Sequence, residues 1–258
     1  MMTTSATPGT TSVEDAVRGA IDALDLDATC RTYHEQNELI WLERWLPAEL
    51  VDALVAEAEA LRPELHRNYI PRHKKGGSVS YHVLRERAPA IMALYRSPAL
   101  LALLGRLSGA ESLELCPETD PHAAALYYYT EPGDHIGWHR DTSYYRGARY
   151  TVLVGLIERS SSRLQCRIHA GDPARETREV ALATEPGTFV AFHGDKLLHR
   201  VTPLGADEER VVLTLEYVTD PRMGRFKRFV SNMKDAIAYF GIAGVFGGRR
   251  RAAPPGPS

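Results

Sequence analysis

The sequence predicts a mainly β protein with flanking helices, in which a jelly-roll-like core is covered by N-terminal and C-terminal helices. Residues from about 111 to 218 form short runs rich in β-branched and aromatic residues, separated by turn signals such as EPGD, AGDP and TEPG. Strands at this spacing are typical of β-sandwiches and barrels. Helical patterns fill the chain before this half, and another follows it. No stretch between these parts resembles a linker, so one domain is expected.

The helices expected in the first half start at Val13, where apolar residues recur at helical spacing and acidic residues occupy the first turn. A short strand-like run covers residues 38–46. Pro47 then opens the amphipathic run PAELVDALVAEAEALRPEL. Proline suits the first helical position, and Ala, Leu and Glu are strong helix formers. A further helical region covers about 88–107, with a break near Pro98, because proline has no amide hydrogen for the helix.

The composition of the two ends sets the expected domain boundaries. Residues 1–12 are rich in Ser, Thr and Gly and are predicted to be disordered, as is the Pro-, Gly- and Arg-rich tail over 247–258. Residues 13–246 are predicted to form a single domain with a β core at about 111–218. The stretch RFVSNMKDAIAYFG has a helical pattern and is expected to close this domain.

Composition also excludes several kinds of partner. The 258 residues carry 31 Lys and Arg against 33 Asp and Glu, a formal net charge of −2, which does not indicate a nucleic-acid-binding protein. No uninterrupted apolar run reaches the roughly 18 residues of a membrane span, and the N-terminus lacks the apolar segment of a secretory signal. Three widely spaced cysteines, Cys30, Cys116 and Cys166, indicate reduced thiols. We therefore expect a cytoplasmic protein that binds neither nucleic acid nor membranes, and the sequence predicts no particular oligomeric state.

The strongest chemical signal is the segment GWHRDTS, which contains His139 and Asp141. In an extended segment, residues two apart project from the same face, so this imidazole and carboxylate would lie side by side. A second histidine, His199, follows in the stretch TFVAFHGDKLLHRVTPL. Two histidines and one carboxylate on one face of a metal leave three positions open, an arrangement that suits non-haem Fe(II) oxygenases. A 2-oxo acid would take two of these positions and dioxygen the third.

Arg210 adds a second part to this pattern, because it opens the apolar strand-like run RVVLTLEYV eleven residues after His199. A dicarboxylate co-substrate needs its far carboxylate anchored in a mostly apolar pocket, and a guanidinium binds a carboxylate through two parallel hydrogen bonds. An H-x-D motif alone arises easily by chance in a chain with 10 histidines. The ordered set of H-x-D, distal histidine and strand-opening arginine is much more specific.

With this ordered set, the β-rich half resembles the Fe(II)/2-oxoglutarate-dependent dioxygenases, which share a double-stranded β-helix. The resemblance covers roughly residues 125 to 218. It implies that three residues are the catalytic iron ligands and that a fourth binds the distal carboxylate of 2-oxoglutarate. The three ligands are His139, Asp141 and His199, and the residue that binds the distal carboxylate is Arg210. Tyr129 is similar to the tyrosine that the prolyl-hydroxylase branch directs at 2-oxoglutarate, and Thr151 is a further candidate for binding this co-substrate.

Longer phrases, YYTEPGDHIGWHRDTSYYRGARYTVLVGL and RFVSNMKDAIAYFG, are similar to a subgroup of small bacterial enzymes that hydroxylate or chlorinate free amino acids. The chlorinating members carry Gly or Ala where Asp141 stands, which opens a site for halide. The carboxylate of this chain therefore implies a hydroxylase that uses Fe(II), 2-oxoglutarate and O2. The implied substrate is a small polar metabolite, either a free amino acid or a derivative of one.

Candidates for substrate contact come from a basic segment and from the motif itself. The segment HRNYIPRHKKGGSVSYHVL, residues 66–84, is interpreted either as a solvated loop or as a lid that supplies cations to the substrate. Arg72 and Tyr81 are its candidate donors. Trp138 is the third candidate, as part of the pocket wall.

Two other classes of function stay open. A cupin-like Zn²⁺-dependent hydrolase or isomerase could use the same His/His/Asp set, but such chemistry needs no dicarboxylate anchor like Arg210. A non-catalytic jelly-roll binding module is the other alternative. A binding module would gain nothing from a metal site with three open positions.

Overall fold

The computed structural model describes residues 12–141 and 145–222. Ser12 caps the first helix, α1 (Val13–Asp22), where its side chain accepts a hydrogen bond from the amide of Asp15. Apart from Ser12, the N-terminus predicted to be disordered lies outside the described residues. The predicted closing helix in RFVSNMKDAIAYFG and the predicted tail over 247–258 lie outside them as well.

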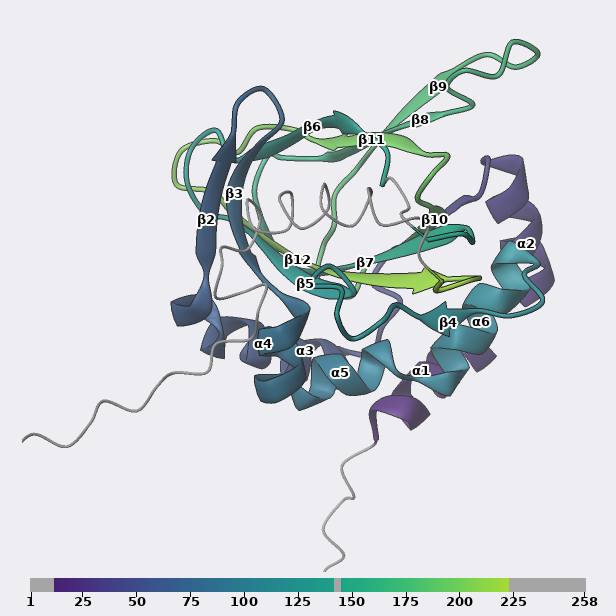
Figure 1. Ribbon diagram of the computed structural model, residues 1–258, viewed down its shortest axis with the longest axis horizontal. Helices are drawn as coiled ribbons and strands as arrows, with labels where there is room; N and C mark the ends of the chain where they lie inside the picture. Colours follow the sequence, from purple (N-terminus) through teal and green to yellow (C-terminus); the bar gives the residue numbers. More distant parts are fainter. Residues whose placement is uncertain (1–11, 142–144, 223–258) are drawn as a thin grey trace, which may run out of the picture.

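Twelve strands of the described residues form one continuous sheet in which the pairings are antiparallel (Figure 1). Their order is β1-β10-β7-β12-β5-β3-β6-β11-β8-β9, with β2 on β3 and β4 on β12. The strands are β1 (Leu39–Leu42), β2 (His66–Ile70), β3 (Lys74–Val79), β4 (Glu114–Leu115), β5 (Ala124–Tyr129), β6 (His135–His139), β7 (Arg149–Arg159), β8 (Leu164–Ile168), β9 (Arg178–Leu182), β10 (Phe189–His193), β11 (Leu198–Val201) and β12 (Glu209–Val218).

The sheet curls into two facing layers that are joined through β3. In Figure 1, β6, β11 and β8 lie above β5, β12 and β7. The first residues of β3, Lys74 and Lys75, pair with β6, whereas residues 77–79 pair with β5. Gly77 lies at this change of partner, where a Cβ atom would come within 2.4 Å of Leu65 Cδ1. The predicted fold class, mainly β with a jelly-roll core and flanking helices, is confirmed.

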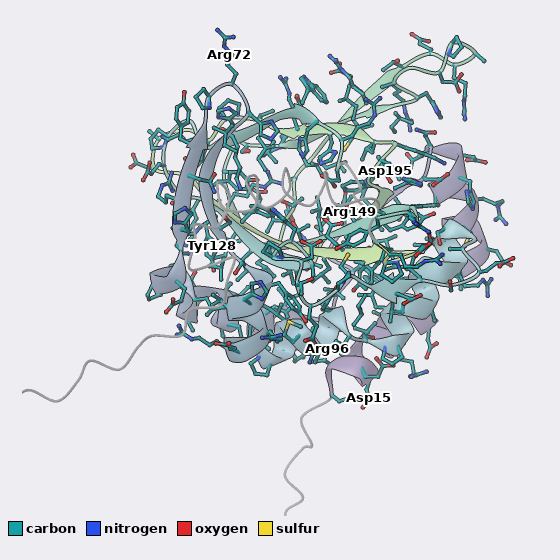
Figure 2. All side chains as sticks on the ribbon, viewed as in Figure 1. Asp15, Arg72, Arg96, Tyr128, Arg149 and Asp195 are labelled. Atoms are coloured by element: carbon teal, nitrogen blue, oxygen red, sulfur yellow. The ribbon has the colours of Figure 1, made fainter. Side chains whose placement is uncertain are left out.

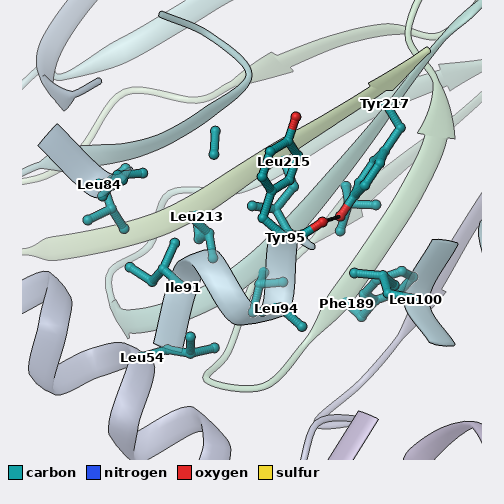
Figure 3. Packing of buried hydrophobic residues seen from close by; sticks show 14 of the residues in the cluster. Leu54, Leu84, Ile91, Leu94, Tyr95, Leu100, Phe189, Leu213, Leu215 and Tyr217 are labelled. Atoms are coloured by element: carbon teal, nitrogen blue, oxygen red, sulfur yellow. Dashed lines mark hydrogen bonds between the residues drawn. The ribbon is translucent and has the colours of Figure 1, made fainter. Parts of the chain in front are cut away.

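Six α-helices in the described part of the chain lie beneath the lower layer (Figure 1). Their apolar faces pack against the sheet or against one another, and this burial is the main driving force for the packing. Figure 3 shows Leu54, Ile91 and Leu94 beside Leu213 and Leu215 of β12. Besides α1, the helices are α2 (Leu26–Glu35), α3 (Ala48–Ala60), α4 (Tyr81–Arg87), α5 (Pro89–Tyr95) and α6 (Pro98–Ser108), with a 3-10 turn over Arg62–Glu64.

The helix break predicted near Pro98 is confirmed, because α5 ends at Tyr95 and α6 begins at Pro98. Helix α2 was not predicted. The predicted β core at 111–218 was too narrow, since β1, β2 and β3 from the first third of the chain join the same sheet. Strands β1 and β3 find partners more than 40 residues away, which local patterns do not encode, and β2 joins the sheet through its hairpin with β3. The basic segment 66–84, expected as a loop or lid, forms the β2–β3 hairpin and the start of α4.

The apolar stretch Pro89–Ser108 is long and apolar enough to span a membrane by length and composition alone. It comprises α5 and α6, however, and more than half of it is buried inside the protein. Ile91, Leu94, Leu103 and Leu104 belong to the main core cluster. This burial is that of a pair of core helices.

Candidate functional site

His139, Asp141 and His199 converge at the upper layer of the sheet. Strand β6 ends at His139, and its neighbour β11 places His199 directly opposite in the pairing register. The Oδ1 atom of Asp141 lies 3.5 Å from His139 Nε2 and 3.7 Å from His199 Nε2. One ligand atom from each of the three residues lies within 4.8 Å of the other two. Strand pairing thus brings together His139 and His199, which are separated by 60 residues in the sequence.

The hydrogen bonds of both imidazoles leave the same nitrogen available to a metal. His139 Nδ1 lies 2.8 Å from the carbonyl of Gly137, and His199 Nδ1 lies 3.2 Å from that of Leu197. A carbonyl only accepts, so each Nδ1 carries the hydrogen and each Nε2 keeps its lone pair. Metal-bound histidines are typically oriented in this way by their second nitrogen. The donor set therefore fits a divalent metal, and its role as a ligand set remains a prediction.

Burial and mutual contact set the protonation states of this trio. Burial, followed by the charge of His139, lowers the pKa of His199 to about 4. Burial opposes ionisation of Asp141, but His199 and His139 outweigh it and hold the pKa of this carboxyl well below its usual value. Near neutral pH, His199 is therefore neutral and Asp141 is ionised. These are the metal-binding forms of His199 and Asp141. For His139, burial lowers the pKa, but the contact with Asp141 outweighs burial and raises it.

Arg210 is buried, with only 1% of its surface exposed, at the start of β12. Its Nε donates to Thr184 Oγ1 at 3.0 Å and lies 3.3 Å from Glu158 Oε2. Its Nη1 is buried and has no hydrogen-bond partner among the residues that the structure describes. Such an orphaned donor is costly unless a ligand satisfies it. The guanidinium also lies 5.5 Å from the ring centre of Tyr129.

These groups face one cavity of about 500 Å³ between the two layers. Strand alternation explains which residues line the cavity, because every second residue of β7 and β12 points inward. On β12 the apolar residues of the other face belong to the helix-packed core. The inward residues of the two strands are Arg149, Thr151 and Leu153 on β7, and Arg210, Val212, Thr214 and Glu216 on β12.

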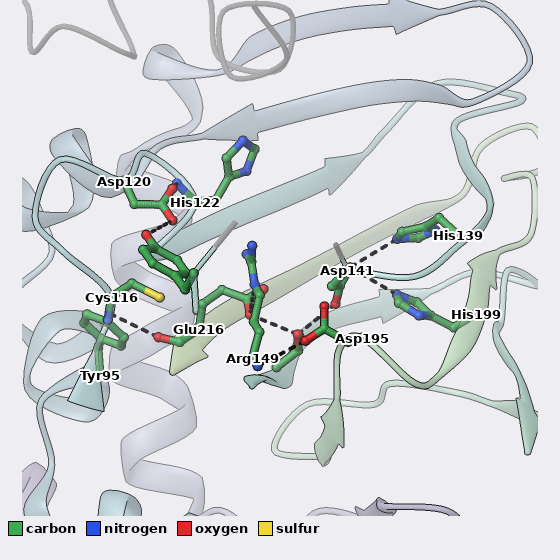
Figure 4. A network of polar contacts seen from close by, with 12 residues as sticks. Tyr95, Cys116, Asp120, His122, His139, Asp141, Arg149, Asp195, His199 and Glu216 are labelled. Carbon is green, nitrogen blue, oxygen red and sulfur yellow. Dashed lines mark hydrogen bonds and ion pairs between the residues drawn. The ribbon is translucent and has the colours of Figure 1, made fainter. Parts of the chain in front are cut away.

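A chain of polar contacts runs from Asp141 into the floor of the cavity (Figure 4). Thr151 Oγ1 lies 2.7 Å from Asp141 Oδ2 and 2.9 Å from Glu216 Oε2. Arg149 Nε donates to the same Glu216 oxygen at 2.8 Å. Burial raises the pKa of Glu216 to about 7 despite the opposing charge of Arg149. His122 also lines the cavity, and burial lowers its pKa to about 4.

Two of the predicted co-substrate residues lie in the cavity wall. Tyr129 is beside Arg210, as expected of a residue that faces the co-substrate. Thr151 also lines the cavity, but its hydroxyl is engaged by Asp141 and Glu216. The binding of 2-oxoglutarate by these residues stays a prediction.

None of the three predicted substrate residues lines the cavity in the described part of the chain, and their contact with substrate stays a prediction. Arg72 is exposed at the tip of the β2–β3 hairpin and points away from the body of the protein (Figure 2). Tyr81 is 2% exposed and packs in the core, with its ring centre 6.1 Å from that of Tyr95. Trp138 lies between the guanidinium groups of Arg167 and Arg200 at 4.3 and 4.7 Å. Neighbouring strand residues face opposite sides, so Trp138 could not share the orientation of His139.

The polar residues that line the cavity and that sequence reasoning missed include His73, His122, Arg149 and Glu216. His73 and His122 belong to none of the sequence motifs that point to the metal or the co-substrate. For Arg149 and Glu216, the sequence did contain a signal. Arg149 opens the apolar run RYTVLVGLI and Glu216 interrupts the run RVVLTLEYV, and a charged residue in a buried strand indicates a polar site.

The sequence profile of the Halogenase D family matches residues 23–147, which include His139 and Asp141 but end before His199. None of the curated protein sequences that were compared matches the chain.

Solved structures with the same fold are more distant in sequence. The epimerase SnoN from nogalamycin biosynthesis is 17% identical, with a TM-score of 0.61 over 74% of this chain and 81% of that chain. The prolyl-4-hydroxylase of Pseudomonas putida is 20% identical, with a TM-score of 0.57 over 76% and 99%. The carbocyclase SnoK, also from nogalamycin biosynthesis, is 16% identical, with a TM-score of 0.62 over 82% and 91%. SnoN and SnoK are described as α-ketoglutarate-dependent non-haem enzymes, and one SnoN structure contains Fe3+ and α-ketoglutarate.

Proposed function

We propose that this chain, which has the fold of the Fe(II)/2-oxoglutarate-dependent oxygenases, is an oxygenase that hydroxylates an unactivated C–H bond of a small polar metabolite. One observation carries this proposal. The His139, Asp141 and His199 trio opens onto the same cavity as the buried Arg210, whose Nη1 has no hydrogen-bond partner. A metal-ligand trio and a carboxylate anchor in one cavity suit a metal together with a dicarboxylate 2-oxo acid.

The chain's own residues have separate tasks in this reaction. His139, Asp141 and His199 would hold Fe(II), and Arg210 would bind the far carboxylate of 2-oxoglutarate beside Tyr129. Iron with 2-oxoglutarate and O2 supplies the oxidising power that removes the substrate hydrogen, while 2-oxoglutarate becomes succinate and CO2. The enclosing layers of the sheet exclude bulk water and orient the substrate.

The substrate we propose is a free amino acid or a close derivative. The cavity wall away from Arg210 carries a buried cation and a buried anion, Arg149 and Glu216, together with Thr214. These two charges already pair with each other at 2.8 Å, and a small zwitterion could extend the pair with one charge on each side, whereas an apolar substrate would offer neither group a further contact. A cavity of about 500 Å³ also suits small molecules.

Hydroxylation is proposed over halogenation because Asp141 supplies a third protein ligand. The Halogenase D match ends soon after this residue, at position 147. Resemblance to the subgroup implies that the chlorinating enzymes have Gly or Ala here. With the carboxylate present, the metal has no vacant anion position next to the histidines.

The experiment that tests this proposal is an anaerobic screen of amino acids with Fe(II) and 2-oxoglutarate, followed by addition of O2. We expect a substrate to perturb the charge-transfer absorption of the complex, and mass spectrometry to find succinate and a product heavier by one oxygen. Chlorinated or epimerised product would overturn hydroxylation while keeping the oxygenase. Turnover without 2-oxoglutarate, or with Zn²⁺ in place of Fe(II), would indicate a hydrolase or isomerase instead. A protein that binds no divalent metal would indicate a binding module.

We also propose that the enzyme works in the cytoplasm. In the described part of the chain, Cys30, Cys116 and Cys166 are free thiols, which is typical of a reducing compartment. Fractionation of the source cells with an antibody to the chain would test this location.

A further inference from the structure

The two oxygens of the Asp141 carboxylate have different partners. Oδ1 is the oxygen closest to both histidines, at 3.5 Å from His139 Nε2 and 3.7 Å from His199 Nε2. Oδ2 points to the floor of the cavity, where Thr151 Oγ1 lies 2.7 Å away. One oxygen is thus presented to the metal position, and the other is occupied by a hydroxyl from the opposite layer of the sheet.

The side chain of Thr151 is fixed in place beside the Asp141 carboxylate. It is the third residue of β7, paired with Phe192 of β10 on one side and Glu216 of β12 on the other. Its side chain is buried and, being β-branched, has few rotamers. Its hydroxyl also contacts Glu216 Oε2, which in turn accepts a hydrogen bond from Arg149 Nε. The buried Arg149–Glu216 ion pair lies next to this hydroxyl, whose single hydrogen can be donated to only one of the two carboxylates at a time.

The backbone of Asp141 is fixed at the same place. Its amide donates to the carbonyl of Gly194 at 3.0 Å, and the amide of Gly194 donates to the carbonyl of Arg149. A Cβ at Gly194 would lie 3.0 Å from Asp141 Cβ and 3.2 Å from Thr151 Oγ1. Only glycine lets the loop after β10 approach this closely. The loop and Thr151 together leave the carboxylate little freedom to turn.

We propose that Thr151 is a positioning residue, whose hydroxyl occupies Asp141 Oδ2 so that the carboxylate binds the metal through Oδ1 alone. This inference rests on the proposed function, which makes Asp141 a metal ligand. A carboxylate free to use both oxygens would take a coordination position that the co-substrate or O2 requires. This assignment replaces the sequence-based expectation that Thr151 binds 2-oxoglutarate.

The test measures metal binding and coupling in variants of Thr151 in the full chain. Thr151→Val keeps the shape and removes the hydroxyl, and we expect about 10- to 100-fold weaker Fe(II) binding under anaerobic conditions. We also expect an altered Fe(II)–2-oxoglutarate charge-transfer band, and more succinate formed per product formed. Thr151→Ser keeps the hydroxyl and should retain the wild-type values. Thr188→Val, at a buried threonine in the turn before β10, is the matched control for folding.

The outcomes separate this inference from the proposed function. If wild-type protein binds no Fe(II), the proposed function fails. If wild-type protein binds Fe(II) and Thr151→Val shows the same affinity, band and coupling, only the role of Thr151 is overturned. Should Thr151→Val not fold, Thr151→Ser and Thr151→Ala differ by the hydroxyl alone. Equal metal affinity and coupling in that pair would then overturn the inference.

Discussion

At the scale of single residues, buried charges that are only partly satisfied identify the site. Arg210 has two protein partners on its Nε but none on Nη1. Leaving such a donor unsatisfied typically costs about 1–3 kcal/mol or more for a charged group. That cost is tolerable if a ligand carboxylate completes the set during function.

The first prediction concerns the anchor for the co-substrate. Arg210→Gln should weaken 2-oxoglutarate binding about 10- to 100-fold, because a charge-assisted hydrogen bond contributes roughly 1.5–3 kcal/mol. Titration of the Fe(II) complex would measure this change. Wild-type protein should prefer 2-oxoglutarate over 2-oxopentanoate, which lacks the far carboxylate, and the variant should lose that preference. The control is Arg159→Gln, an exposed arginine near the same end of the sheet. A variant that keeps the preference would contradict the assignment.

A second residue-scale prediction concerns Asp141. We expect Asp141→Gly to abolish hydroxylation, because the third protein ligand of the metal is lost. The vacated position should let chloride bind. Chloride binding would then change the absorption of the Fe(II)–2-oxoglutarate complex. Unchanged hydroxylation, assayed with added iron, would show that Asp141 is not a ligand.

At the scale of elements, β7 and β12 separate the polar site from the apolar core by alternation. On β12, Val211, Leu213 and Leu215 pack against the helices, while Arg210 and Glu216 face the cavity. A slip of one residue in register would exchange these two sets. The long pairing of β12 with β7, which runs from Glu209 to Val218, fixes this register.

The third prediction concerns the close contact of β7 with the turn before β10. A Cβ at Gly155 would lie 2.1 Å from the carbonyl oxygen of Thr184, whose hydroxyl accepts from Arg210. Gly155→Ala should therefore lower the free energy of unfolding by about 1–3 kcal/mol and weaken 2-oxoglutarate binding. Gly105→Ala in α6, where a Cβ meets no atom within 4 Å, should be neutral or stabilising by up to about 1 kcal/mol. Thermal unfolding of both variants measures this contrast, and equal effects would contradict it.

At the scale of the whole molecule, the proposed metal position lies between residues of the two layers. His139 and His199 belong to the upper layer, and Asp141 is hydrogen-bonded to Thr151 of the lower layer. A metal bound by all three would add cross-links that the unfolded chain lacks.

The fourth prediction follows from this arrangement. A metal that binds only the folded state stabilises it by about 2.7 kcal/mol at 100 times its dissociation constant. We expect Fe(II), or Mn(II) as an air-stable probe, to raise the Tm and a chelator to reverse the rise. His199→Ala should lose most of the shift. An equal shift in wild type and variant would place the metal elsewhere.

Local sequence patterns were sufficient for the fold class, for the break between α5 and α6, and for the residues that converge on Asp141. Alternation in β6 also contained the information that Trp138 faces away from His139. Local patterns did not reveal that β3 joins the two layers, because its partners lie in β5 and β6, more than 40 residues away.

The sequence by itself determined the chemical types that this protein brings to its site, since two imidazoles, a carboxylate and a buried guanidinium can be recognised from their spacing. The tertiary structure alone decided which other side chains share the cavity. In the folded protein Arg72 lies at an exposed hairpin tip, and Arg149 and Glu216 line the cavity. The physical reason is that strand pairing over long sequence distances, and not local propensity, sets which residues face each other across a curled sheet.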